Sequence, residues 1–330
     1  MDCLEPPPAT FRILSHSIHF ISIPIYCLAL YSLIFIKSNV FTTYRIFLIW
    51  HVSENIFFEM YSAFFLAPAL HAPFVVMRTT GILSHFGINS LVQFYILTFS
   101  IECSAVCISE MFYFRYKASL VSYKDHYFTY FLRFLVYSTR CFAIFDFIFP
   151  IVTYQDANKF QQIHKLALLQ QNPSAQFLRC DSVYLLSAFA DYVSIIVLSF
   201  WIVQFVVLCV AIPGAIVYIT LNIPKSTSET TWKVQQQLLK SLAIQALIHA
   251  IMLGGPNSLF ILALFLGYNS EELAYSAFLS LIYHGFISTF AMIVFTKPVR
   301  HHILECLKLR KTFETKGNSL KKSNQGTVTT

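Results

Sequence analysis

The sequence predicts an all-α, polytopic membrane protein: a seven-transmembrane helix bundle with its N-terminus outside. Charged residues make up only 12% of the 330 residues and hydrophobic residues 56%, whereas soluble domains carry about 25% charged residues. The apolar runs are about 20 to 26 residues long, enough for a helix to cross a hydrocarbon core of roughly 30 Å. Because barrel strands need only about ten alternating residues, the run lengths favour helices.

Seven apolar segments are candidate spans, and the last is the clearest. Residues 274–296 carry no formal charge and end at Lys297-Pro298, where basic groups favour the cytoplasmic side. Residues 1–13 are expected to form an extracellular segment, and the first span is expected to act as its own signal anchor, because no cleavable signal is evident. The predicted spans are residues 14–36, 46–70, 88–112, 127–149, 194–219, 241–266 and 274–296.

Several spans contain charged residues, which are costly in a bilayer and should face the bundle interior. The second span holds Glu54 and Glu59, and the third holds Glu102. The fourth is the weakest span because it contains Arg140 and Asp146. We predict that Arg140 pairs with an acid or lies near the outer interface. Losing the fourth span or splitting another would leave six or eight spans, and these alternatives stay open.

The segments between the spans set the orientation through the positive-inside rule. With the N-terminus outside, the inner segments hold sixteen Lys and Arg residues and the outer segments five. We expect outer loops at residues 71–85 and 150–192 and an inner loop at 222–240. The cytoplasmic tail, residues 297–330, should begin with a short amphipathic helix and continue as disordered chain. Cys306 in that helix is a candidate for palmitoylation.

The chain lacks the motifs of soluble enzymes: GxGxxG, GxxxxGK[ST], HExxH and GxSxG are all missing. The eight cysteines form no CxxC, and Cys103 and Cys107 are interpreted as packing residues in mid-membrane. His301-His302 is interpreted as a surface feature. We therefore predict no catalytic site, no cofactor and no metal site. The net charge of +7 reflects the inner segments and the tail rather than nucleic-acid binding.

Two function classes other than a receptor stay open on these residues. A multi-span transporter or ligand-gated channel could use Glu54, Glu59 and Glu102 as an ion path, although no internal repeat is apparent. A structural or chaperone-like membrane protein is the second. A ligand-evoked current without any G protein would favour the channel.

Short motifs in several spans resemble those of one receptor family. The last span contains His284-Gly285 followed by Ser288-Thr289, and it ends at Lys297-Pro298-Val299-Arg300. Together with the seven-span layout, these motifs resemble nematode serpentine chemoreceptors of class H, with class I of the same superfamily as the close alternative. The resemblance runs from about residue 12 to residue 302. Further matches are Ile23-Pro24-Ile25-Tyr26, Gly81-Ile82-Leu83 and Leu242-Ala243-Ile244-Gln245.

The sequence departs from the family pattern at two places. Val299 stands where the family has a tyrosine, so any role of that tyrosine is lost. The third span ends in Phe112-Tyr113-Phe114-Arg115 where class H often has Phe-Glu-Asn-Arg, so the Phe and Arg are kept but the acid and amide are not. These departures put the detail of G-protein coupling in doubt.

The resemblance implies a G-protein-coupled receptor for a small external chemical, at the plasma membrane and, by family, in a sensory cilium. An odorant-like ligand would bind between the outer halves of the third, fifth, sixth and seventh spans, and a heterotrimeric G protein would bind inside. The candidate ligand contacts, which could equally be packing or lipid-facing side chains, are Tyr95, Phe99, Glu102, Tyr192, Phe260 and Tyr283. The candidate G-protein contacts, which could equally be topology signals, are Arg115, Lys117, Lys233, Lys240 and Arg300.

Receptors of this layout usually join the outer end of the third span to the second outer loop by a disulfide. Cys180 lies in that predicted loop, but no cysteine lies near the start of the third span. Cys3 in the outer N-terminal segment is the other exposed candidate. Cys3 and Cys180 are therefore a candidate disulfide pair in the oxidising exterior, with two free thiols as the alternative.

Overall fold

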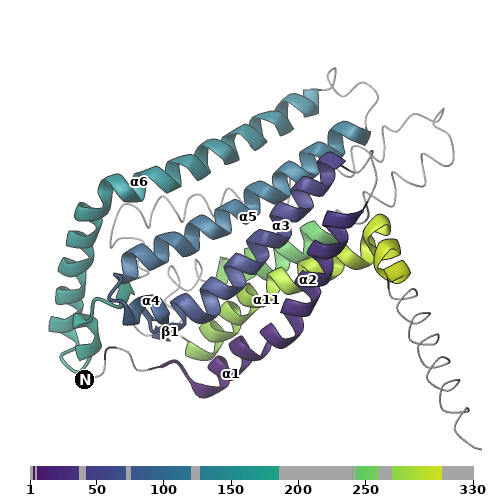
Figure 1. Ribbon diagram of the computed structural model, residues 1–330. Coiled ribbons are helices and arrows are strands. Elements are labelled where there is room, and N and C mark those ends of the chain that lie inside the picture. The colour runs from purple at the N-terminus through teal and green to yellow at the C-terminus, as the bar shows by residue number, and fades with distance from the viewer. Residues whose placement is uncertain are drawn as a thin grey trace, which may run out of the picture.

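The computed structural model describes residues 3, 6–36, 42–71, 76–119, 127–185, 240, 243–256, 258–259 and 270–306. Within these ranges the chain is a bundle of long helices with a small sheet at one end, which we call the capped end (Figure 1). The all-α membrane class predicted from composition is confirmed in its main part, and the sheet is an addition that the sequence analysis did not predict.

Four helices among the described residues are long and apolar enough to cross a membrane. A helix satisfies its backbone hydrogen bonds internally, as a segment in lipid must. Its side chains must also be mainly apolar, because charged groups are costly in the bilayer. These helices are Ala9–Phe35, Ser90–Phe114, Thr129–Gln171 and Glu271–Phe295. The fifth predicted span, 194–219, and most of residues 257–266 of the sixth lie outside the described residues.

The first predicted span is two helices in near continuity, α1 (Ala9–Ser17) and α2 (His19–Phe35). α1 begins at Ala9 because the three prolines before it, Pro6 to Pro8, have no backbone N–H to donate and disfavour a helix that starts earlier. Pro24 lies inside α2, where a membrane helix tolerates it. Phe11 of α1 packs on Tyr275 at a ring-centroid distance of 4.8 Å, so the N-terminal helix is held against the last span.

The second predicted span, 46–70, is wrong at its end. α3 (Thr42–Met60) continues as a π-helix, Tyr61–Leu66, and then stops. Pro68 disfavours helical backbone in the residue before it, and Ala67 adopts a left-handed φ of 41°. The chain then forms strand β1 (Pro68–His71) rather than a last helical turn.

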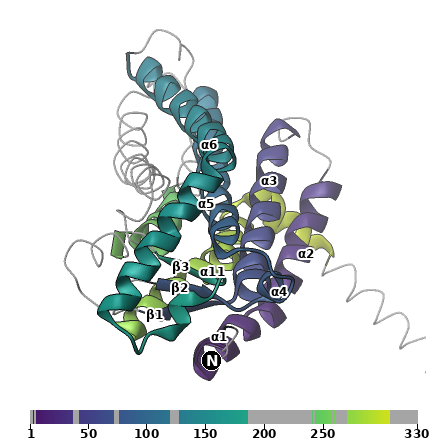
Figure 2. The same ribbon diagram turned by 90° about the vertical axis from the view of Figure 1, so that its left-hand side faces the viewer.

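The residues predicted as an outer loop, 71–85, include strand β2 (Val76–Thr79) and the short helix α4 (Ile82–His85). β2 is the central strand of an antiparallel sheet in the order β1-β2-β3, where β3 is Val183–Leu185. Met77 pairs with Leu70 on one side and with Tyr184 on the other. Figure 2 shows the three strands lying together beside the second half of α6.

α5 (Ser90–Ser119) and α6 (Tyr127–Gln171) are the longest described helices. α6 passes through Pro150 and bends near its middle (Figure 1), and a proline inside a helix is a common cause of a bend. The prediction of an outer loop from residue 150 onward is therefore wrong up to Gln171. After it come the 3₁₀ helix Gln176–Arg179 and β3.

The second half of α6 is helical because it buries a stripe at four-residue spacing. Ala157, Gln161, Lys165 and Leu169 are all buried, and residues four apart lie on one helical face. Gln161 donates to the Leu185 carbonyl at 3.2 Å and accepts from the Leu185 N–H at 3.0 Å. The Gln161 side chain thus makes the two hydrogen bonds to Leu185 of β3 that the backbone of a neighbouring strand would make.

The last span is α11 (Glu271–Phe295), whose start is capped by Ser270 accepting from the Leu273 N–H. Residues 297–306 form a further helix, in which Val299 and Ile303 are buried in the core at the uncapped end. The sixth segment packs on α11 through the π-helix Ala250–Gly254.

The prediction for Arg140 is confirmed. Its guanidinium on α6 forms an ion pair with Glu110 on α5, and it also lies 5.2 Å from the ring centroid of Tyr137. An isolated arginine in a span is costly, so this pair is what allows the fourth span to carry a charge.

Candidate functional site

The side of α3 that faces α2 carries a buried carboxyl with a full set of partners. Glu59 is 1% exposed. Its Oε2 accepts from the Tyr26 hydroxyl at 2.6 Å, and its Oε1 accepts from the Ser22 hydroxyl and lies 2.8 Å from Nδ1 of His19. Three groups of α2 thus converge on one acid, which fixes α2 against α3.

One turn earlier, α3 contacts α11 through polar side chains. Nε2 of His51 lies 2.9 Å from the Ser288 hydroxyl, and the Asn55 amide donates to Thr289 Oγ1 at 3.0 Å. Ser288 and Thr289 are the second half of the motif in the last span. The motif therefore places two hydroxyl groups against α3 in the interior of the bundle.

The glycine of the same motif allows this close approach. A Cβ on Gly285 would lie 2.9 Å from Asn55 Cβ and 3.0 Å from the Tyr26 hydroxyl oxygen. Any side chain there would separate α11 from α3. Gly285, Ser288 and Thr289 thus act together: the glycine brings the helices close and the hydroxyls make the contacts.

Three buried imidazoles meet beside this contact. The ring of His249 lies 5.2 Å from His51 and 5.7 Å from His284, measured between centroids. Nε2 of His249, Nε2 of His284 and the Gln245 amide are buried and have no hydrogen-bond partner among the described residues. Within those residues no group of three or more His, Cys, Asp or Glu side chains is arranged to hold a metal ion. We call His51, Asn55, His249, His284, Ser288 and Thr289 the polar core.

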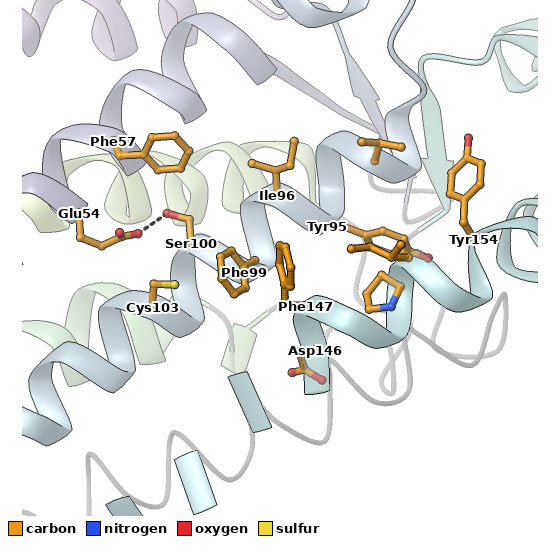
Figure 3. Close-up of a pocket in the computed structure, with 13 residues that line it drawn as sticks. Glu54, Phe57, Tyr95, Ile96, Phe99, Ser100, Cys103, Asp146, Phe147 and Tyr154 are labelled. Carbon is orange, nitrogen blue, oxygen red and sulfur yellow. Dashed lines mark hydrogen bonds between the residues drawn. The ribbon is translucent and has the colours of Figure 1, made fainter. Parts of the chain in front are cut away.

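Another face of α3 borders a cavity of about 550 Å³. The cavity lies between α3, α5 and the bend of α6, and its walls are mainly aromatic and aliphatic (Figure 3). Its polar lining includes Glu54, whose Oε1 accepts from the Ser100 hydroxyl at 2.7 Å. The lining residues are Glu54, Phe57, Val92, Tyr95, Ile96, Phe99, Ser100, Cys103, Asp146, Phe147, Pro150, Ile151 and Tyr154.

The cavity contains two of the six predicted ligand contacts, Tyr95 and Phe99. Glu102 is absent from its lining, and the Glu102 carboxyl lies beside that of Asp146. Tyr283 is elsewhere, because its hydroxyl donates to the Leu14 carbonyl at 3.0 Å. Tyr192 and Phe260 lie outside the described residues. The cavity is thus bordered by the second, third and fourth predicted spans rather than by the third, fifth, sixth and seventh.

The predicted G-protein contacts are described only in part. The Lys117 ammonium lies 4.7 Å from the Tyr113 ring centroid, and Arg300 donates to the Val294 carbonyl at 3.1 Å. Lys240 is exposed. Lys233 and the side chain of Arg115 lie outside the described part of the chain.

The N-terminal segment is attached to the capped end. Cys3 and Cys180, the pair singled out from the sequence, are joined by a disulfide with a Cα–Cα distance of 5.7 Å. The Ser182 hydroxyl donates to the Cys3 carbonyl at 3.0 Å. At the other end of the chain, the Cys306 thiol is partly exposed and lies 4.0 Å from Nδ1 of His302.

The sequence analysis predicted neither the polar core nor the three-stranded sheet at the capped end, which we call the cap. His284, Gly285, Ser288 and Thr289 were noticed only as a family motif, although their spacing places several of them on one helical face. His51 and Asn55 are likewise one turn apart. A search for facing polar pairs in the second and last spans would have found this contact.

Comparison with known families finds a match that spans most of the chain. The family described as "Serpentine type 7TM GPCR chemoreceptor Srh" matches residues 7–309. No curated protein matches the chain.

Proposed function

Because the chain belongs to the Srh family of serpentine seven-transmembrane chemoreceptors, we propose that it binds a small external chemical and activates a heterotrimeric G protein. The family makes it a multi-pass membrane receptor rather than an enzyme. The orientation with the capped end outside, the plasma membrane and the sensory cilium are part of the proposal.

The observation that carries the proposal is the aromatic cavity beside Tyr95 and Phe99. Apolar concave sites with a few polar groups are typical of small-molecule binding. The cavity lies along the half of α5 nearest the cap, and the disulfide at the cap fits an oxidising exterior. An external ligand would therefore reach it from the outer half of the bundle.

Signal transfer would proceed through α3, which borders the cavity on one face and contributes to the polar core on another. Glu54 lines the cavity, and its neighbour Asn55 bonds α11. A ligand that contacts α3 better in one arrangement of the helices would shift the population toward that arrangement. The inner end of α5 and the helix that follows α11, where Lys117 and Arg300 lie, would then present the G-protein surface.

The channel alternative gains no support from the three acids that suggested it. Glu59 faces α2, Glu54 faces Ser100 on α5, and Glu102 faces Asp146 on α6. An ion path needs its polar groups along one line, and these carboxyls point to three different neighbours.

The test is expression of the tagged receptor in cells with a second-messenger reporter, a chemical panel and parallel current recording. We expect a ligand-dependent second-messenger response that Lys117→Glu and Arg300→Glu reduce at unchanged surface density. Arg179→Glu, at the capped end, is the matched charge reversal and should leave the response unchanged. A ligand-evoked current without second messenger would contradict the proposal, and so would antibody access to a C-terminal tag on intact cells.

A further inference from the structure

The cavity is bordered by acids without basic partners. Of its thirteen lining residues two are acidic, Glu54 and Asp146, and none is Lys or Arg. Asp146 is 6% exposed and lies beside Glu102, a third acid. On α6, Arg140 is paired with Glu110. The ion pairs found among the described residues give Glu54, Glu102 and Asp146 no cation.

The cavity has a polar end and an aromatic end. Figure 3 shows Glu54, Ser100 and Cys103 together at one end and Tyr154 at the other, with Phe99 and Phe147 between them. The Ser100 hydroxyl occupies one oxygen of Glu54, and no donor from the described residues reaches the second. Because Glu54 lines the cavity, this oxygen is available to a ligand there.

We propose that this cavity binds an amphipathic amine, with its ammonium group beside Glu54 and its apolar body between Phe57, Phe99 and Phe147. The proposal rests on the proposed function, because it names the ligand class of the same receptor. It assigns a site between α3, α5 and α6, where the family layout led us to expect the third, fifth, sixth and seventh spans.

Three physical reasons select an amine. Ionisable groups within a membrane are costly and usually functional, and a cation would compensate the acids that have no partner. A hydrogen bond from an ammonium to a carboxylate is about twice as strong as a neutral one. Aromatic faces also attract a cation within about 6 Å. A carboxylate ligand would instead meet two acids and no base.

The cavity opens on the side of the bundle. Phe57, Phe147 and Ile151 are 49%, 52% and 65% exposed, so its rim faces the surroundings of the helices. An amphiphile dissolved in the outer leaflet reaches this rim directly. This access favours an amine with an apolar body over a small hydrophilic one.

Cys103 provides a binding readout that does not depend on signalling. It lines the polar end of the cavity, whereas Cys27 is exposed on α2 and lies outside the lining. Membranes containing the receptor are treated with a small neutral maleimide, and alkylation of both cysteines is followed by peptide mass spectrometry. The probes are phenethylamine and octylamine, each with the alcohol and the carboxylate of the same skeleton.

We expect the amines to slow alkylation of Cys103 and to leave Cys27 unchanged, whereas the alcohols and carboxylates protect at least about tenfold less well. Glu54→Gln keeps the shape and the Ser100 bond, and it should raise the amine concentration needed for protection at least about tenfold. Asp156→Asn, an exposed acid further along α6, is the matched control and should have no effect.

Equal protection by the alcohols, or protection unchanged in Glu54→Gln at normal surface density, would overturn the amine proposal. The second-messenger assay separates it from the proposed function. Amine protection without any second-messenger response supports the site and contradicts the receptor function. A response to other chemicals, with no protection by either amine, supports the receptor function and contradicts the amine site.

Discussion

Two glutamates on different faces of α3, Glu59 and Glu54, differ in how many partners the neighbouring helices give them. Glu59 faces α2 and contacts Ser22, Tyr26 and His19. Glu54 faces α5, accepts one bond from Ser100 and borders the cavity. The two residues are five positions apart, which turns them by about 140° around the helix. The position on one helix therefore decides whether a carboxyl fixes the bundle or lines a space.

This contrast separates structural from functional charge. A buried polar group with all its partners rigidifies the packing around it, whereas an ionisable group in a span with few partners marks a site by default. Neither role can be assigned from the residue type alone, because it depends on how many donors the neighbouring helices supply.

The largest effect should come from removing the acid with the full set of partners. Glu59→Leu leaves the hydroxyls of Ser22 and Tyr26 buried without an acceptor, at about 1–3 kcal/mol for each unmade bond, and it removes the acid that lies beside His19. We expect a loss of about 3 kcal/mol or more in the free energy of unfolding, seen as a large fall in thermal stability in detergent. Glu54→Leu should cost about 1 kcal/mol or less, and equal losses for both variants would remove the contrast.

The next effect concerns the approach of α11 to α3. Gly285→Ala places a Cβ 2.9 Å from Asn55 Cβ, and overpacking of this kind costs about 1–3 kcal/mol. Thermal stability and surface density should both fall. Gly255→Ala is the matched control, because the nearest heavy atom to its Cβ is the Ala250 carbonyl oxygen at 4.0 Å. If the Gly285→Ala receptor were as stable as Gly255→Ala, the stability of the bundle would not depend on the close approach of α11 to α3 at Gly285.

The sequence predicted the spanning helices well because lipid imposes a simple rule. A stretch of about twenty apolar residues is both necessary and easy to recognise, and α11 begins within three residues of the prediction. α3 is less obvious, since Arg45, Glu54 and Glu59 lower its hydropathy. These side chains have partners on the neighbouring elements: Glu59 bonds Ser22 and Tyr26 of α2, Glu54 bonds Ser100 of α5, and Arg45 donates to the Ile36 carbonyl.

The cap could not be predicted by the same rule. β1, β2 and β3 are only three or four residues long. β1 and β2 are close in the sequence, but β3 follows β2 by about a hundred residues, so only tertiary contacts specify the complete sheet. The second half of α6 was missed because its buried stripe includes Gln161 and Lys165, which resemble loop residues by composition. The prediction of the cavity was only partly correct. Tyr95 and Phe99 line it, but its walls on α3 and α6 were not predicted, because they depend on how the helices pack.

A smaller effect tests the same contrast outside the predicted spans, where Lys165 is a buried cation with few partners. Its Nζ donates to the Cys180 carbonyl at 3.5 Å, and burial lowers the pKa of this ammonium from 10.5 to about 8, opposed by nearby Asp181. Between these two pKa values the unfolded chain holds a proton that the folded chain does not, so stability rises with pH.

The shift corresponds to about 3 kcal/mol at most, and we expect about 1–2 kcal/mol. Lys165→Met should therefore be more stable than the wild type at pH 7, with the difference shrinking as the pH rises from 8 towards 10.5. Lys159→Met, an exposed lysine on the same helix, is the control for a lost surface charge. Thermal unfolding at several pH values measures both, and a wild type whose stability falls through this range would contradict the assignment.

The smallest effect compares one hydroxyl on each side of α3. Ser288→Ala removes the bond to His51 inside the polar core, and Ser100→Ala removes the bond to Glu54 at the cavity. Each hydrogen bond is worth about 1 kcal/mol. His51 is fully buried and loses a partner that water cannot replace there, so Ser288→Ala should lower thermal stability. Glu54 borders the cavity, where water can take the place of the hydroxyl, so Ser100→Ala should change stability less and alter amine protection of Cys103 instead. If the two variants exchanged these phenotypes, the polar core would be the binding region and the cavity the structural one.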